Sequence, residues 1–212
     1  MGKLNPSIPG AFHGTVGPVV GTTWKGIAVI KSKPPRKRRR STEAQLRQMA
    51  KLKLMTPFVR PLTELLNETY ECCTFQMSCF NKTLSYNMRN AISGDYPDFT
   101  IDYSRFVLGV GDLRNPENIS VHSETEKKLS FTWTDNSGDG SARVTDQAFV
   151  AIYCEVLGQW VTGDPGPQRN AGSYTLDVTA LSGRAVYTYI GFLSADAQFV
   201  STSIYAGLVH IL

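Results

Sequence analysis

"KLSFTWTDNSGDGSARVTDQAFVAIYCEV", residues 128–156, is the stretch that decides the fold. Two apolar runs rich in β-branched and aromatic residues, 128–135 and 147–156, flank a segment dense in Gly, Asp, Asn and Ser. Runs of this length and composition are typical of strands, and the polar segment between them is typical of a turn. The stretch therefore predicts two neighbouring β-strands.

Similar runs recur at nearly regular intervals through the C-terminal part of the chain, separated by Gly, Pro, Asn, Asp and Ser clusters. They cover residues 117–123, 158–163, 173–179, 185–194 and 199–211. Seven short strands in about one hundred residues indicate an antiparallel β-sandwich over residues 113–212.

Helices are expected in the preceding segment, residues 41–112. Thr42 followed by Gln45 forms a capping box, and the apolar spacing after it predicts a helix that ends near Met55. The pair Thr-Pro at 56–57 is typical of a second N-cap with proline in the first turn. It predicts a second helix that is kinked or delayed by Pro61 and runs to about Tyr70.

A third helix is expected over residues 81–94, because Gly94 is a typical residue just beyond a helix end. The alternation in residues 98–111 then predicts a strand that closes the helical segment. The chain before this segment, residues 1–40, is expected to form a basic arm with a β-hairpin, in which Gly26 follows Trp24-Lys25 in a turn. The fold class is therefore α+β, with a small N-terminal β unit and helices ahead of the sandwich.

The C-terminal segment resembles a fibronectin type III module. The resemblance rests on Trp133 in "LSFTWTD" and on "LSGRAVYTYIGFLSADAQFVSTS", residues 181–203. It implies an immunoglobulin-like sandwich with a buried tryptophan on its second strand. It implies almost nothing about function, because this fold supports many roles.

The N-terminal part resembles an uncharacterised protein family of Bacteroidota. Residues 14–54, "GTVGPVVGTTWKGIAVIKSKPPRKRRRSTEAQLRQMAKLKL", match its G-x-x-G-x-V-V-G-x-x-W-K-G signature, its proline and basic stretch and its T-x-x-Q-L helix start. Residues 87–113 and the closing β-domain are also similar, so the resemblance covers nearly the whole chain. The resemblance implies a fixed architecture and no assigned reaction.

Charge is distributed very unevenly along the chain. Residues 1–40 hold nine Lys or Arg and no carboxylate, whereas the remaining residues hold thirteen basic and eighteen acidic side chains, a net charge of −5. Seven of the basic residues fall within residues 31–40. A basic head on an acidic body predicts an anionic partner, or the acidic body itself as the partner.

The candidate binding residues are the basic side chains of this arm and of the helix that follows it. They are Lys31, Lys33, Arg36, Lys37, Arg38, Arg39, Arg40, Arg47 and Lys51. They favour non-specific binding to a nucleic-acid backbone or to a neighbouring subunit, in an assembly of the phage or mobile-element kind and as a possible homo-oligomer. The alternative is a protein-binding or cell-surface adhesion module with a solvated basic linker.

No catalytic motif is present, so we expect no enzyme and no cofactor. The three histidines are dispersed, and the cysteine pattern C-C-x5-C (Cys72, Cys73 and Cys79) lacks the spacing of a zinc site. Residues 135–146 carry Asp135, Ser137, Asp139, Gly140 and Asp146 at calcium-loop spacing. Strands flank the segment, however, and we expect a polar turn without metal.

Targeting features point to the cytoplasm or to an assembled particle. The first ten residues lack the apolar run of a signal peptide, and no run of about 18 apolar residues could span a bilayer. The bunched cysteines are typical of a reducing compartment. We therefore expect no membrane partner.

Overall fold

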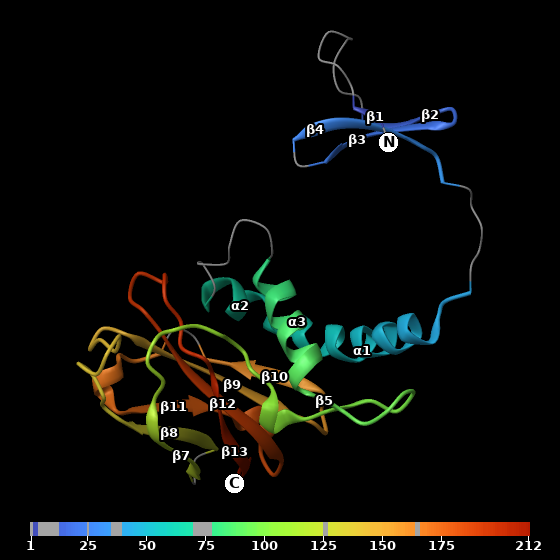
Figure 1. Cartoon of the computed structure of the whole chain (residues 1–212). Coiled ribbons are helices and arrows are strands. Elements are labelled where there is room, and N and C mark those ends of the chain that lie inside the picture. Colours follow the sequence, from blue (N-terminus) through green and yellow to red (C-terminus); the bar gives the residue numbers. More distant parts are fainter. Residues whose placement is uncertain are drawn as a thin grey trace. The chain divides into compact units, whose positions relative to one another are not determined.

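The structure is a computed structural model of the 212-residue chain (Figure 1). It describes residues 2–3, 13–24, 26–34, 40–69, 78–124, 127–163 and 166–212. The chain divides into two compact units, Met1–Thr42 and Glu43–Leu212. The helical segment and the β-sandwich, which the sequence separates near residue 113, thus belong to the same unit.

The N-terminal unit is a four-stranded antiparallel sheet with the strand order β1-β4-β3-β2. Its strands are β1 (Gly2–Lys3), β2 (Gly14–Val16), β3 (Val19–Trp24) and β4 (Ile27–Ser32). Gly17 and Gly26 occupy the turns on either side of β3 with φ of 59° and 81°, a conformation that glycine adopts without steric cost. This confirms the expected β unit over its described residues.

The first helix is longer than the sequence predicts. α1 (Glu43–Val59) does not end near Met55 but continues through Pro57. A proline inside a helix removes one backbone hydrogen bond and crowds the preceding turn. Burial of Met55, Phe58 and Val59 in the core offsets that cost, because the helix must continue past Pro57 to place all three side chains. The second helix is delayed at Pro61, as predicted: it begins as α2 (Thr63–Thr69), after the 3₁₀ turn η1 (Arg60–Leu62) that contains this proline.

The third helix is shorter at its C-terminus than predicted. α3 (Cys79–Asn90) begins after Ser78, whose hydroxyl accepts a hydrogen bond from the Asn81 amide at 3.3 Å, and it ends four residues before Gly94. The reason is strand pairing: β5 (Ile92–Ser93) pairs with β6 (Thr100–Ile101). Gly94, with φ of 82°, therefore belongs to the hairpin between these strands and not to a helix cap.

The prediction of a strand over residues 98–111 is mostly wrong. Only β6 is extended and paired, and the 3₁₀ turn η2 (Tyr103–Arg105) follows it directly. Asp102 caps this turn, since its Oδ1 accepts hydrogen bonds from the Ser104 amide at 3.1 Å and from the Ser104 hydroxyl at 2.6 Å. This local cap starts the 3₁₀ turn, so the strand ends at Ile101 although the alternating sequence pattern continues.

All seven strands predicted for the C-terminal segment are present (Figure 1). One sheet has the order β11-β8-β7 and the other β10-β9-β12-β13, with every pairing antiparallel. The fold is therefore α+β with a fibronectin type III-like sandwich. The strands are β7 (Glu117–Glu124), β8 (Lys128–Thr134), β9 (Gln147–Cys154), β10 (Gln159–Thr162), β11 (Ser173–Asp177), β12 (Ala185–Leu193) and β13 (Ile204–His210).

Two hydrophobic cores lie on opposite faces of the sandwich sheet β10-β9-β12-β13. Between the two sheets, Phe131 and Trp133 of β8 pack in one buried cluster with Ile152 of β9 and Phe192 of β12. On the other face, the helices pack against the sheet in a second cluster, which includes Phe58, Leu62, Phe106, Phe149, Tyr153 and Tyr189. The unit Glu43–Leu212 thus has three layers, with the sheet of β9 and β12 in the middle. Among the helices that the structure describes, none has the length and apolar character needed to cross a bilayer.

Candidate functional site

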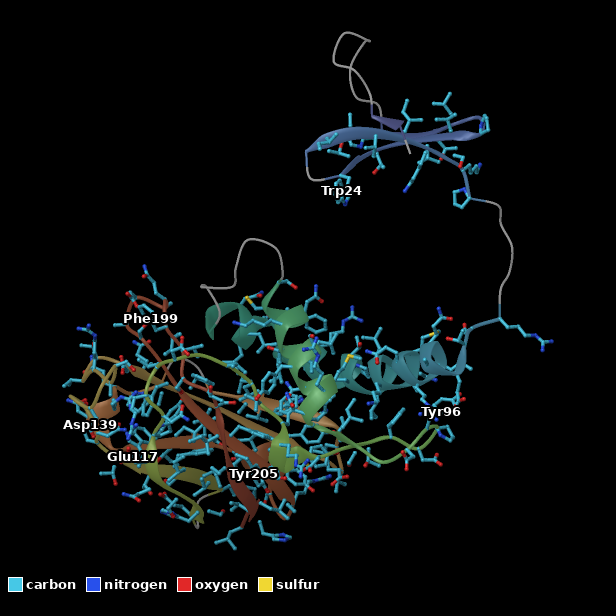
Figure 2. All side chains as sticks on the ribbon, in the orientation of Figure 1. Trp24, Tyr96, Glu117, Asp139, Phe199 and Tyr205 are labelled. Carbon is cyan, nitrogen blue, oxygen red and sulfur yellow. The ribbon has the colours of Figure 1, made fainter. Side chains whose placement is uncertain are left out.

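The N-terminal sheet exposes apolar side chains on both of its faces. The strand register places Val20, Trp24, Ile27 and Val29 on one face with Lys31, hereafter the Trp24 face, and Val16, Val19, Ala28 and Ile30 on the other, the Val16 face. Trp24 is 59% exposed (Figure 2), Val16 66% and Ile27 39%. Among the described residues of this unit, only Gly21 and Val29 are buried.

The predicted basic residues fall into three groups. Lys31, Lys33 and Arg40 are exposed at the end of the N-terminal unit. Arg36, Lys37, Arg38 and Arg39 lie outside the described residues.

The remaining two, Arg47 and Lys51, lie on α1 and already have partners. Arg47 forms an exposed ion pair with Glu43 at 2.6 Å, and the Lys51 ammonium lies 5.0 Å from the centre of the Phe99 ring. Such contacts are weak in water, so both side chains remain able to meet another anion.

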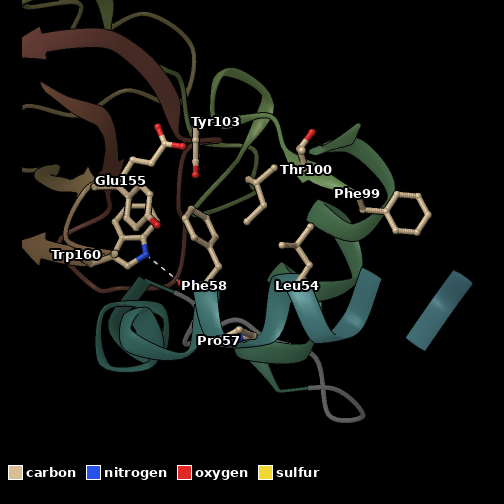
Figure 3. A pocket seen from close by; sticks show the side chains of 11 residues that line it. Leu54, Pro57, Phe58, Phe99, Thr100, Tyr103, Glu155 and Trp160 are labelled. Carbon is tan, nitrogen blue, oxygen red and sulfur yellow. Dashed lines mark hydrogen bonds between the residues drawn. The ribbon is translucent and has the colours of Figure 1, made fainter. Parts of the chain in front are cut away.

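A pocket of about 430 Å³ opens on the helix-facing side of the sandwich (Figure 3). Four segments contribute to it: the C-terminal part of α1, strand β6 with the residue before it, η2, and the hairpin of β9 and β10. The lining residues are Leu54, Pro57, Phe58, Phe99, Thr100, Ile101, Tyr103, Tyr153, Glu155, Gly158 and Trp160. We call it the aromatic pocket.

Strand register builds the aromatic wall of this pocket. Tyr153 on the central strand β9 is paired directly with Trp160 on β10 and with Tyr187 on β12, so three rings lie in one row across the sheet. Side chains directly opposite each other on neighbouring strands are in contact. The Tyr153 and Trp160 ring centres are 4.9 Å apart, and Phe58 of α1 lies 4.7 Å and 5.0 Å from these two rings.

Hydrogen bonds fix the rings relative to the helix. The Trp160 indole Nε1 donates to the Phe58 carbonyl oxygen at 2.9 Å (Figure 3). The Tyr189 hydroxyl donates to the carbonyl oxygen of Tyr103 at 2.8 Å. The Tyr103 ring in turn lies 5.4 Å from Tyr153 and 4.2 Å from Tyr187, centre to centre. The wall is therefore preformed.

Glu155 is the single charged residue among those that line the pocket. It follows β9 directly and begins the tight turn to β10, where the Gly158 amide donates to its carbonyl oxygen at 3.1 Å. Its carboxylate accepts a hydrogen bond from the Tyr187 hydroxyl at 3.2 Å. No ion pair involves Glu155 among the described residues.

The phenol groups around Glu155 stay protonated. Burial raises the pKa of Tyr103, Tyr153 and Tyr187 above their ordinary range, and the Glu155 carboxylate adds to the shift. A neutral phenol retains both its hydroxyl donor and its acceptor lone pairs. The pocket therefore offers aromatic surface, neutral hydroxyl groups and one negative charge.

Asp146, the last residue of the segment with calcium-loop spacing, forms a buried ion pair with Arg169. Asp146 and Arg169 are both fully buried, and the Asp146 Oδ2 atom lies 3.1 Å from the Arg169 guanidinium. Asp135 accepts hydrogen bonds from the amide and hydroxyl of Ser137. No group of three metal-ligating side chains occurs in the described part of the chain. The Asp146 carboxylate, at the position of the twelfth residue of a calcium loop, thus has the Arg169 guanidinium as its cationic partner.

The sequence analysis missed the residues of the aromatic pocket. One signal was available: β9 and β12 read as nearly continuous apolar runs, "QAFVAIYC" and "AVYTYIGFL". Strands buried on both faces have this composition, whereas β7, "ENISVHSE", alternates and has one exposed face. The runs therefore indicate a further layer over the sandwich, on the side where the pocket lies.

Several solved structures resemble about half of this chain. The fn3 domain of human collagen alpha-1(XX) chain is 19% identical, with 49% of this chain and 91% of that chain covered and a TM-score of 0.36. The chicken CNTN1 FN1–FN3 domains are 10% identical over 49% of this chain and 35% of that one, with a TM-score of 0.40. A computer-redesigned β-sandwich protein is 18% identical over 48% and 94%, with a TM-score of 0.34.

No curated protein matches the chain in sequence. A family model does match, and it spans residues 11–207, which include strands β2 to β4 of the N-terminal sheet, the helices and nearly all of the sandwich. The chain therefore belongs to this family, the family of unknown function DUF6266.

Proposed function

We propose that the protein is a non-catalytic assembly subunit whose N-terminal unit binds a second copy of the chain. The observation that carries this proposal is the exposure of apolar side chains on both faces of the N-terminal sheet. A sheet normally buries its apolar face against another layer, because folding gains most of its free energy from that burial.

The described part of the N-terminal unit supplies no such second layer. Its described strands form one sheet, and among its described residues only Gly21 and Val29 are buried. Contiguous exposed apolar surface of this kind is typical of protein–protein interfaces. A protein layer on at least one face would complete the unit.

Charge complementarity favours a second copy as the partner. The first 40 residues carry nine positive charges, and the rest of the chain carries a net charge of −5. The basic head of one copy is thus attracted to the acidic body of another. Most soluble oligomers are assembled from identical subunits.

Substitutions specific to each face test the proposal. Val16→Asp places a charge on the Val16 face, Ile27→Asp places one on the Trp24 face, and Val144→Asp is the control at an exposed position in the sandwich unit. The proposal predicts that at least one of the two sheet variants reduces the solution mass at moderate salt, while Val144→Asp leaves it unchanged. Circular dichroism verifies that each variant is folded. An unchanged mass for both sheet variants would contradict the proposal.

A second candidate function is non-specific binding to nucleic acid, favoured by the seven basic residues in positions 31–40. Each phosphate contact releases counterions, so such binding weakens steeply with salt. Replacing Arg36, Lys37, Arg38, Arg39 and Arg40 by Ser tests it. Loss of co-purifying nucleic acid, measured as the ratio of absorbance at 260 and 280 nm, would favour this candidate.

A further inference from the structure

We propose that the aromatic pocket binds an organic cation on an apolar stem, of which a lysine side chain is the representative. The pocket lies entirely within Glu43–Leu212, so this inference is independent of the assembly role of the N-terminal unit. It rests on the shape, the charge and the rigidity of the pocket.

The pocket combines an apolar floor with aromatic walls. Leu54, Pro57 and Ile101 offer aliphatic surface, and the rings of Phe58, Tyr103, Tyr153 and Trp160 line the same pocket. Phe99 lies at the edge, and its ring points away from the pocket (Figure 3). An alkyl chain fits the floor, and a cation over the ring faces is attracted by their negative π surface.

The single charge selects the sign of the ligand. Glu155 contributes a carboxylate at the edge of the pocket, and no Lys, Arg or His belongs to the lining. The carboxylate has the Tyr187 hydroxyl as its hydrogen-bond donor and no cationic partner among the described side chains. A phosphate or carboxylate ligand would meet repulsion there, whereas an ammonium or guanidinium group would form an ion pair.

Rigidity makes binding favourable for a small group. The Trp160–Phe58 hydrogen bond and the cross-strand pair of Trp160 and Tyr153 hold the wall in place before a ligand arrives. A preformed site loses less conformational entropy on binding than a flexible one.

The test is a titration of the full-length ¹⁵N-labelled protein, followed by the indole resonance of Trp160. The chain has three tryptophans, and single Trp→Phe variants assign their resonances. The probe is N-acetyl-lysine methylamide, and N-acetyl-norleucine methylamide is the matched neutral probe with an alkyl stem and no charge. We expect the lysine probe to shift the Trp160 resonance at millimolar concentration and the norleucine probe to leave it unshifted.

Charge removal provides the second measurement. Glu155→Gln keeps the size of the side chain and should weaken binding of the lysine probe by about fivefold, the scale of an exposed ion pair. Glu64→Gln, at an exposed position on α2, is the control and should bind like the parent protein. Binding that Glu155→Gln leaves unchanged, equal shifts with the norleucine probe, or no shift up to about 50 mM lysine probe would each overturn the inference.

A third titration identifies the source of the cation. A peptide with residues 31–40 of this chain, "KSKPPRKRRR", carries seven basic side chains. If it shifts the Trp160 resonance at a concentration about tenfold or more below that of the lysine probe, the ligand is a basic protein segment. If the peptide binds no better than the single side chain, the ligand is a small amine. Both results support a cation site.

Discussion

Trp160 and Phe58, 102 residues apart in the sequence, are joined by a hydrogen bond of 2.9 Å from the indole nitrogen to the backbone carbonyl oxygen. The contact connects the C-terminal part of α1 to strand β10. It also places two aromatic rings of the pocket 5.0 Å apart, centre to centre. One polar contact thus attaches the helical layer to the sandwich and shapes the candidate binding site.

Replacing this indole tests its structural contribution. Trp160→Phe keeps an aromatic ring but removes the donor, so the Phe58 carbonyl loses its partner in a half-buried place. We expect the free energy of unfolding to fall by about 1–2 kcal/mol, measured by urea denaturation. Trp24→Phe, at an exposed position, should change it by less than about 0.5 kcal/mol. Equal losses in the two variants would contradict this assignment.

The Asp146–Arg169 pair should be the most sensitive polar contact in the sandwich. Besides Asp146, the Arg169 guanidinium donates to Asn136 Oδ1 at 2.6 Å and to the Arg114 carbonyl at 2.9 Å, and it stacks on the Phe192 ring at 3.9 Å. Arg169→Met would leave the Asp146 carboxylate buried without its cation. The expected loss of stability is about 3–5 kcal/mol.

The exposed Arg47–Glu43 pair on α1 provides the matched control for Arg169. Arg47→Met should cost about 0.5 kcal/mol or less, because water screens that pair. A loss below about 1 kcal/mol for Arg169→Met would show that the buried network does not hold the loop. Calcium should leave the unfolding curve of the parent protein unchanged, since Asp146 is occupied by Arg169.

Asn87 connects α3 to the chain that enters the sandwich. The side chain is fully buried, its amide donates to the Val107 carbonyl at 2.7 Å, and its oxygen accepts from the Val107 amide at 2.9 Å. Asn87→Leu would leave both backbone groups without partners, and we expect a loss of about 2–3 kcal/mol by urea denaturation. Asn90→Leu, on the exposed side of the same helix, should stay within about 0.5 kcal/mol.

Asp102 should titrate at an abnormally low pH. The hydrogen bond from the Ser104 hydroxyl is the main cause that lowers the pKa of this carboxyl group, and the Ser104 amide and Arg105 also contribute. Because the folded-state pKa is the lower one, the carboxylate stabilises the fold above the ordinary aspartate pKa. That contribution is lost as the pH falls through the folded-state value. Ser104→Ala should raise the Asp102 pKa in an NMR titration, and an unchanged value would contradict this cause.

The sequence predicted the sandwich well because its strands carry strong local signals. β7 alternates along its whole length, and the turns contain residues such as Gly138 and Gly158 that adopt positive φ. The helix ends were predicted less well. Pro57 is a local signal for a boundary, but burial of Phe58 and Val59 outweighs it, and that burial depends on the distant strand β9.

The aromatic pocket could not be located from local patterns. Its lining comes from segments as far apart as Leu54 and Trp160, and only the register of β9 with β10 and β12 brings Trp160, Tyr153 and Tyr187 into one row. The basic arm, by contrast, is evident from composition alone. The role of the arm depends on its partner, and the composition of the arm indicates only that this partner is negatively charged.

The most direct test of the assembly role is the solution mass of the purified protein by light scattering at low and high salt. Absorbance at 260 and 280 nm is recorded in the same run. We predict a species well above the 23.4 kDa of one chain, with the absorbance ratio of protein alone. A monomer at both salt concentrations would contradict the proposed assembly, and a large species that carries nucleic acid and dissociates with salt would favour phosphate binding by the basic arm.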